Sequence, residues 1–171
     1  STDWMELKRI GHLRDLPHNG NAGFERFGMF YAYQMTAPGI PVIYYGDEFG
    51  MTGANDPGNR NPMKFEGLTR QEAALKSWVI SCVDFRRSSM AMMYGDFEWL
   101  FNDSDRVIIR RTYRNETVIT IINRSQEDFA WSASNGFESY GKLVKQIGNG
   151  KAFKNPYKVA AGSALMLKFI K

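Results

Sequence analysis

One short run of residues restricts the fold of this chain more than any other feature. Ile40-Pro41-Val42-Ile43-Tyr44-Tyr45 is continuously apolar, is rich in β-branched and aromatic residues, and lies between Pro38-Gly39 and Gly46. An apolar run without polar alternation is typical of a strand that is buried on both faces, as in a parallel sheet covered by helices. The sequence therefore predicts a buried strand over residues 40–45.

Helical patterns stand on both sides of this predicted strand. Apolar residues recur at helical spacing at Phe24, Phe27, Tyr31 and Met35. Downstream, a polar loop over residues 47–67 precedes Thr69 and Glu72, which have the spacing of a capping box and open a second apolar-periodic run. The order predicted for the first half of the chain is therefore helix, buried strand, long polar loop, helix.

The character of the sequence changes to β beyond Tyr94-Gly95. Short apolar runs alternate with turn residues. The strands predicted from them span residues 97–101, 107–113, 117–122, 128–131, 141–146 and 164–169. Such a series of short strands is typical of an antiparallel sandwich, and the second and third strands form a predicted hairpin. We expect this part to fold from local hairpins, independently of the first half.

A single parallel-type strand has no partner in this pattern. Unpaired backbone groups buried in an apolar setting are unfavourable, so the strand requires neighbours. The missing strands belong either to a larger domain of which this chain is a part, or to a second polypeptide. We predict the first arrangement, with residues 1–94 as an incomplete domain and residues 95–171 as a separate β domain.

Composition excludes several classes of function. The 171 residues carry a formal net charge of +4, and the basic residues are scattered rather than clustered, which does not predict a nucleic-acid surface. The single cysteine, Cys82, lies in an apolar helical run and is expected to be buried. His12, His18 and Cys82 do not have metal-site spacing, so no metal site is predicted. We expect no membrane span and no signal peptide at Ser1.

Several short sequence motifs, in the order in which they occur along the chain, resemble the α-amylase family, glycoside hydrolase family 13. Residues 38–48 (PGIPVIYYGDE) resemble the family's stretch through the eighth barrel strand, and residues 55–60 (NDPGNR) resemble the loop that follows it. Residues 86–89 (RRSS) and 94–97 (YGDF) resemble the step from the last barrel helix into the C-terminal domain. The resemblance implies an α+β chain: the last β/α unit of a (β/α)₈ barrel followed by an antiparallel all-β sandwich domain.

The resemblance also implies the chemistry of the parent enzyme, which is retaining hydrolysis of α-1,4-linked glucans such as starch and maltooligosaccharides. Retention needs two carboxyl groups about 5 Å apart, which the family takes from its fourth and fifth barrel strands. No position in this sequence matches them, and no Asn-His-Asp word is present. We therefore assign no catalytic residue, and we expect the chain alone to be inactive.

Two loop residues, Asp56 and Arg60, match family positions that contact glucose units. A carboxylate accepts from sugar hydroxyls and a guanidinium offers several fixed donors, although the two side chains also suit an ion pair that stiffens the loop. Glu48 matches a non-catalytic position, and we expect it to form structural hydrogen bonds. We expect Tyr44 and Tyr45 to pack in the interior. We expect the same of Trp99 and Trp131, although these two tryptophans are also suited to stack on starch.

Two other classes of function remain open. In one alternative, the chain is a stand-alone carbohydrate-binding or interaction module without catalysis. In the other, it completes its barrel with another polypeptide. An uncovered apolar surface around residues 42–45 would argue against a finished module. The expected partner is an α-glucan, with self-association through the exposed strand. No cofactor is predicted, and nothing in the sequence supports the calcium found in some relatives. Family members are commonly secreted or periplasmic, and the sequence itself assigns no compartment.

Overall fold

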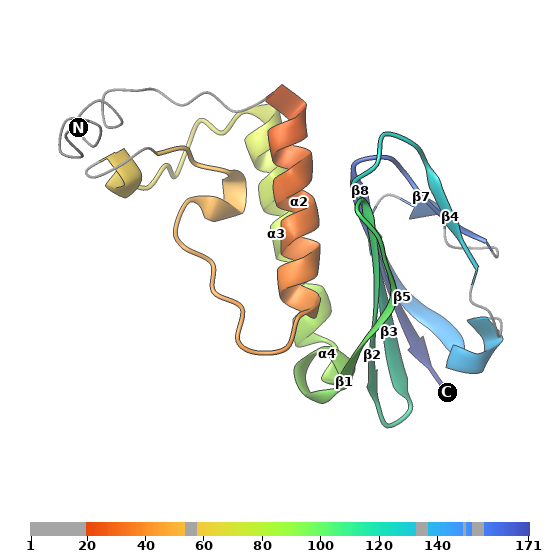
Figure 1. The fold of residues 1–171 in the computed structure, drawn as a ribbon. Coiled ribbons are helices and arrows are strands. Elements are labelled where there is room, and N and C mark those ends of the chain that lie inside the picture. The colour runs from red at the N-terminus through yellow and green to blue at the C-terminus, as the bar shows by residue number, and fades with distance from the viewer. Residues whose placement is uncertain (1–19, 54–57, 133–136, 149, 152–155) are drawn as a thin grey trace, which may run out of the picture.

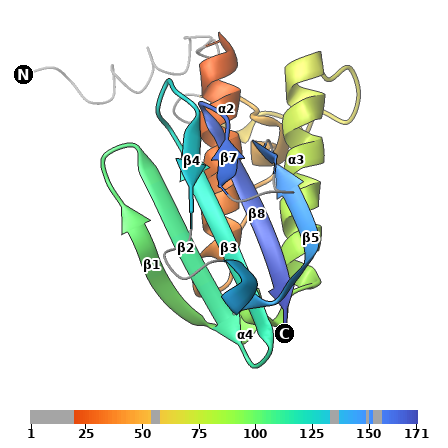
Figure 2. The same cartoon turned by 90° about the vertical axis from the view of Figure 1, so that its right-hand side faces the viewer.

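The computed structural model describes residues 20–53, 58–132, 137–148, 150–151 and 156–171. These residues form three layers, in which a helical layer, a five-stranded sheet and a smaller three-stranded sheet lie side by side (Figure 1). Viewed from the side of the small sheet, α2 and α3 lie behind the five-stranded sheet and run along it (Figure 2). The α+β class predicted from the sequence is confirmed.

Three α-helices and three short 3₁₀ helices are present in the described residues. They are α2 (Gly20–Thr36), η1 (Asp47–Phe49), η2 (Gly58–Arg60), α3 (Arg70–Arg87), α4 (Met90–Tyr94) and η3 (Phe137–Tyr140). The predicted capping box is confirmed, since Thr69 Oγ1 accepts from the Glu72 amide at 3.3 Å and Glu72 Oε2 accepts from the Thr69 amide at 2.6 Å. The sequence did not predict α4, which is a single turn capped by Ser89.

All strand pairs are antiparallel. The strands are β1 (Asp96–Asn102), β2 (Arg106–Tyr113), β3 (Glu116–Asn123), β4 (Phe129–Trp131), β5 (Lys142–Gly148), β6 (Gly150–Lys151), β7 (Tyr157–Val159) and β8 (Ser163–Ile170). The larger sheet has the order β1-β2-β3-β8-β5, and the smaller one β4-β7-β6. The predicted sandwich strands are confirmed, whereas β6 and β7 were not predicted because each is only two or three residues long.

The predicted hairpin between β2 and β3 is confirmed. Tyr113 pairs with Glu116 across a two-residue turn, and Arg114 in that turn has φ +53°. Positive φ at this position is what a tight hairpin turn requires. The two outer strands of the five-stranded sheet are irregular, since the register shifts between Trp99 and Phe101 in β1 and between Leu143 and Lys145 in β5.

Apolar side chains cover both faces of the five-stranded sheet. One core lies between the sheet and the helices and includes Met35, Phe85, Met92, Val118 and Met166. The other lies between the two sheets and includes Ile108, Ile121, Tyr157, Leu165 and Phe169. The strands of the five-stranded sheet therefore share a core with α2, α3 and α4. That residues 95–171 fold independently of the first half stays a prediction.

Two buried arginines hold the C-terminal end of α2. Arg86 donates to the carbonyls of Met35, Ala37 (3.1 Å) and Gly39 (2.7 Å). Arg111 in β2 donates to the carbonyl of Thr36 at 2.6 Å and to that of Gly95 at 2.8 Å. The last carbonyls of a helix carry partial negative charge and lack intrahelical partners, so cations are favourable there.

A second polar junction joins β3, β8 and α4. The buried carboxylate of Glu116 accepts from the Ser89 hydroxyl and, at 3.1 Å, from the Ala91 amide, and it forms an ion pair with Lys168 at 3.0 Å. Burial would raise the pKa of Glu116, but the hydrogen bonds from Ser89, Lys168 and Ala91 outweigh it and the pKa is lowered. Glu116 thus stabilises the turn in which the chain passes from helix to sheet.

The strand predicted over residues 40–45 does not form in this structure. The segment pairs with no strand among the described residues, and the Val42 carbonyl instead accepts a hydrogen bond from Gln34 Nε2 at 2.7 Å. Ile40 and Val42 are 92% and 73% exposed, so the burial predicted for this segment is also absent in this chain. The physical reason is that a parallel-type strand needs neighbouring strands, and no strand of either sheet lies beside it.

We expect Glu116→Gln to lower the free energy of unfolding at neutral pH by about 2 kcal/mol, because a buried charge-assisted network loses its anion. The stabilisation from a carboxylate with a lowered pKa is fully present above its unfolded pKa and is lost as pH falls through its folded pKa. Wild-type stability should therefore fall more steeply on acidification than that of the variant. Urea unfolding at pH 7 and pH 4 measures this, and equal slopes would contradict it.

Candidate functional site

The long polar loop after residue 46 is anchored firmly at its start. Phe49 in η1 is fully buried, and a side chain at Gly50 would meet Phe24 of α2 and Leu75 of α3 at 3.3 Å. Gly50 has φ +76°, which favours glycine. The first turn of the loop is therefore clamped against both long helices.

The two acidic residues at the start of the loop have structural surroundings. Glu48 Oε2 accepts from the Gly46 amide at 2.7 Å, which is the kind of role predicted for it. Burial and then the charge of Glu48 raise the pKa of Asp47. Burial and the charges of Asp47 and Glu48 also raise the pKa of the inaccessible Tyr31 beneath them. Glu48 thus stabilises the turn, whereas burial and the Glu48 charge disfavour the ionised form of Asp47.

Tyr44 and Tyr45 form an aromatic pair at the end of residues 40–45. Their ring centroids are 4.6 Å apart, and the Tyr45 hydroxyl donates to the Asn61 carbonyl at 3.1 Å. Both rings are partly exposed, contrary to the interior packing predicted from sequence, because the segment that carries them has no sheet around it. The hydrogen bond ties the middle of the loop to the end of the segment.

Gly53 allows the loop to fold back on itself. A Cβ atom at this position would lie 2.5 Å from the Gly58 carbonyl oxygen and 2.9 Å from the Asn59 Cα, so only glycine fits without moving the backbone. The far end of the loop is fixed by Lys64, whose Nζ contacts Glu72 Oε2 at 2.8 Å. Burial would raise the pKa of Glu72, but this contact and the bonds within the capping box lower it.

Arg60 ends η2 on the exposed side of this loop. Burial and the Tyr44 hydroxyl raise the pKa of Tyr45, and the Arg60 charge acts in the opposite direction, which associates the guanidinium with the tyrosine pair. Asp56, the other residue predicted to bind substrate, lies outside the described residues, so the predicted Asp56–Arg60 ion pair stays a prediction. A guanidinium beside two phenols offers hydrogen bonds and ring faces to a hydroxyl-rich ligand.

Within the described residues, no three His, Cys, Asp or Glu side chains are grouped as metal ligands. No helix in the described part of the chain is long and apolar enough to cross a membrane. The loop surface thus presents a cation and aromatic rings, without a metal centre among the residues described.

Several known proteins are similar in sequence to this chain. No protein-family model matches the chain. A cyclomaltodextrinase of Geobacillus thermopakistaniensis is 35% identical over 127 residues, which cover 73% of this chain and 21% of the relative. A cyclomaltodextrin glucanotransferase of Bacillus sp. (strain 1-1) is 32% identical over 109 residues, covering 64% of this chain and 15% of the relative.

Solved structures give the same result. An α-amylase of Geobacillus thermoleovorans complexed with acarbose superposes with a TM-score of 0.67 at 25% identity, covering 85% of this chain and 33% of that one. A cyclic α-maltosyl-(1→6)-maltose hydrolase of Arthrobacter globiformis has the same TM-score and identity and covers 86% and 31%. The chain belongs to the α-amylase family. It spans about a fifth of the length of the two cyclomaltodextrinases it matches.

Two tryptophans of this α-amylase-family chain differ in their surroundings. Trp131 is half-buried against the core between the sheets, as predicted. Trp99 was also expected in the interior, but it is 46% exposed and stacks on Tyr33 of α2 with ring centroids 6.2 Å apart. Alternation along β1 gives no signal for this contact, because Tyr33 is 66 positions away in the sequence.

We expect Gly53→Ala to loosen the loop without unfolding the two cores, because the added Cβ displaces the backbone at Gly58. Hydrogen exchange should rise in residues 58–65 and stay unchanged in β2 and β3. Unchanged exchange in the loop of the variant would show that the close approach at Gly53 does not fix its conformation.

Proposed function

We propose that this chain forms the end of a (β/α)₈ catalytic barrel and the C-terminal antiparallel sandwich domain of a retaining glycoside hydrolase. The parent enzyme would act on α-1,4-linked glucans such as starch and maltooligosaccharides. In this proposal residues 40–45 are the last barrel strand, α3 is the helix after it, and the domains divide near residues 94 and 95. The observation that carries the proposal is the fixed loop that presents Arg60 directly beyond the C-terminal end of that segment.

The position of the loop supports a role at a substrate cleft. Active sites of (β/α)₈ barrels lie at the C-terminal ends of the strands, in the loops that lead into the helices. The loop begins at such an end, is anchored through Phe49 and Lys64, and leads into α3. We propose Arg60 and Asp56 as its substrate-binding residues.

The chemistry of bond cleavage is not assigned to this chain. Retaining hydrolysis needs a nucleophile and an acid/base about 5 Å apart, and no residue here matches the family's catalytic positions. Glu48 is engaged with the Gly46 amide, which supports its structural role. We propose that the chain binds and positions sugar units while the carboxyl pair of the parent acts on the bond.

The uncovered apolar surface favours this proposal over a finished binding module. Ile40, Val42 and Tyr44 are largely exposed, and Phe27 and Phe30 of α2 are partly exposed. Monomeric proteins rarely leave contiguous apolar surface of this kind uncovered. The surface is accounted for if residues 40–45 take neighbouring barrel strands in the parent.

We expect Arg60→Ala to weaken binding of maltotriose to the chain by about tenfold, because charge-assisted hydrogen bonds to sugar hydroxyls are lost. Isothermal titration or NMR titration at fixed ionic strength measures the dissociation constant. Arg70→Ala is the matched control, since Arg70 is an exposed arginine at the start of α3. Equal affinity in wild type and Arg60→Ala would remove Arg60 from the proposed site.

We also propose that isolated copies of this chain associate through the uncovered surface, since burying it removes apolar area from water. Sedimentation velocity over a dilution series should show a concentration-dependent dimer. Val42→Lys should abolish the dimer, whereas Val144→Lys, at an exposed valine on β5, should retain it. A wild-type chain that stays monomeric at high concentration would contradict this proposal.

A further inference from the structure

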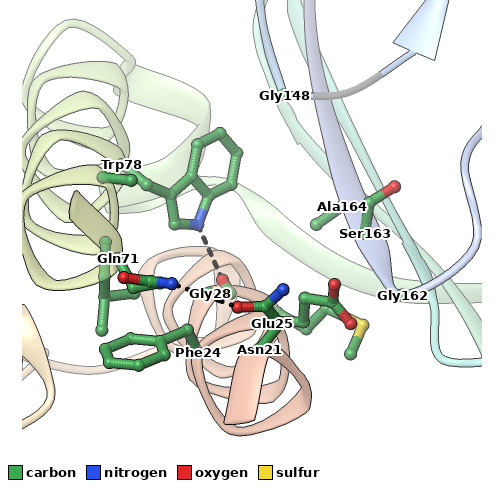
Figure 3. A pocket seen from close by; sticks show the side chains of 13 residues that line it. Asn21, Phe24, Glu25, Gly28, Gln71, Trp78, Gly148, Gly162, Ser163 and Ala164 are labelled. Atoms are coloured by element: carbon green, nitrogen blue, oxygen red, sulfur yellow. Dashed lines mark hydrogen bonds between the residues drawn. The ribbon is translucent and has the colours of Figure 1, made fainter.

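A second concave surface lies between the helices and the five-stranded sheet, and we call it the helix–sheet cleft. Its volume is about 440 Å³, which is within the range of about 300–1,000 Å³ that small-molecule sites occupy. It is lined by residues of α2 and α3 and by the adjoining ends of β5 and β8 (Figure 3). None of the described residues that line it belongs to the loop that carries Arg60.

An aromatic wall forms one side of the cleft. The Trp78 indole N–H donates to the Gly28 carbonyl at 2.8 Å, which fixes the orientation of the ring. The ring is only partly buried, and Figure 3 shows open space between it and Ala164 of β8. Phe24 adds a second partly buried ring on the helical side. An oriented indole face is suited to stack on the apolar face of a sugar ring.

Polar groups gather at the mouth of the cleft. Asn21 and Gln71 lie in the first turns of α2 and α3, and Gln71 Nε2 approaches Asn21 Oδ1 at 3.5 Å. Glu25 stands on the next turn of α2 and forms no ion pair with another described residue. Among the described residues, no lysine or arginine lines the cleft. The mouth therefore offers a carboxylate that accepts hydrogen bonds and two amides that both donate and accept.

Three glycines let the segments that form the walls approach one another closely. The Gly162 backbone passes beneath Glu25, since a Cβ there would lie 3.0 Å from the Glu25 Oε2 atom. A side chain at Gly28 would meet the Trp78 ring at 3.4 Å, and one at Gly148 would lie 2.1 Å from the Ala164 carbonyl oxygen. Glycine at these positions permits the close approaches that bring the Glu25 carboxylate and the Trp78 indole to the same opening.

We propose that the helix–sheet cleft is a second binding site for a short, neutral α-glucan, separate from the loop site. Trp78 would stack on a sugar ring, Glu25 would accept from its hydroxyls, and Asn21 and Gln71 would complete the contacts. The described lining residues include a carboxylate and no cation, which disfavours anionic ligands, and the carboxylate with two amides matches a hydroxyl-rich ligand. The choice of an α-glucan over another polyol rests on the function proposed above.

The experiment is a titration of the ¹⁵N-labelled 171-residue chain with maltotriose. The indole N–H signal of Trp78, assigned with Trp78→Phe, reports on the cleft. We expect this signal to shift in a saturable manner. Ala74→Phe should weaken the apparent affinity by about tenfold or more by filling the cleft, and Glu25→Ala by about tenfold by removing the acceptor. Ala73→Phe is the matched control, because Ala73 is an exposed neighbour that does not line the cleft.

The outcomes separate this inference from the proposed function. Saturable shifts at Trp78 that survive Arg60→Ala and Ala73→Phe but not Ala74→Phe support the second site. Maltotriose binding that depends on Arg60 and leaves the Trp78 signal unmoved overturns the inference and leaves the proposed function standing. Shifts at Trp78 with choline, a quaternary ammonium probe, but not with maltotriose overturn the assigned ligand class. The absence of any maltotriose binding contradicts both proposals.

Discussion

The position of the whole helical layer depends on how the C-terminal end of α2 is held. Arg86 and Arg111 approach it from α3 and β2, and together they occupy the last carbonyls of the helix and those of the turn that follows. A guanidinium carries five donors in a rigid plane, so each can bridge several carbonyls at once. Because residues 40–45 leave from this turn, the two arginines also set the starting point of the segment and of the loop that carries Arg60.

Features that depend on neighbouring residues could be predicted from the sequence, and features that depend on absent neighbours could not. The capping box of Thr69 and Glu72 and the β2–β3 hairpin are local, and both were predicted correctly. The run over residues 40–45 has the composition of a buried strand, but a strand forms only against a partner backbone. Its composition is typical of a strand surrounded by other strands. Its conformation in this structure is that of a segment without a partner strand among the described residues.

The two candidate binding sites could likewise be predicted only where they depend on neighbouring residues. Arg60 could be predicted because it belongs to a motif that resembles the family. Its place beside Tyr45 and Asn61 is compatible with sugar binding, which stays a prediction. The helix–sheet cleft gave no sequence signal, since its walls come from segments about fifty to 140 positions apart and depend on close approaches at glycines such as Gly162. The burial of Arg111 could not be predicted either. Alternation along a strand indicates which face of the sheet a side chain occupies, but it does not indicate which helix end packs against that face.

The irregular outer strands of the five-stranded sheet have a consequence for solubility. A regular edge strand presents free N–H and C=O groups to which a strand of another molecule can add, and this is a common start of ordered aggregation. In β1 the register shift beside Trp99 interrupts that row of groups, and exposed Glu98 places a charge along it. In β5 the shift before Lys145 has the same effect. Removing either irregularity to obtain a tidier sheet would therefore make the chain more prone to form fibrils.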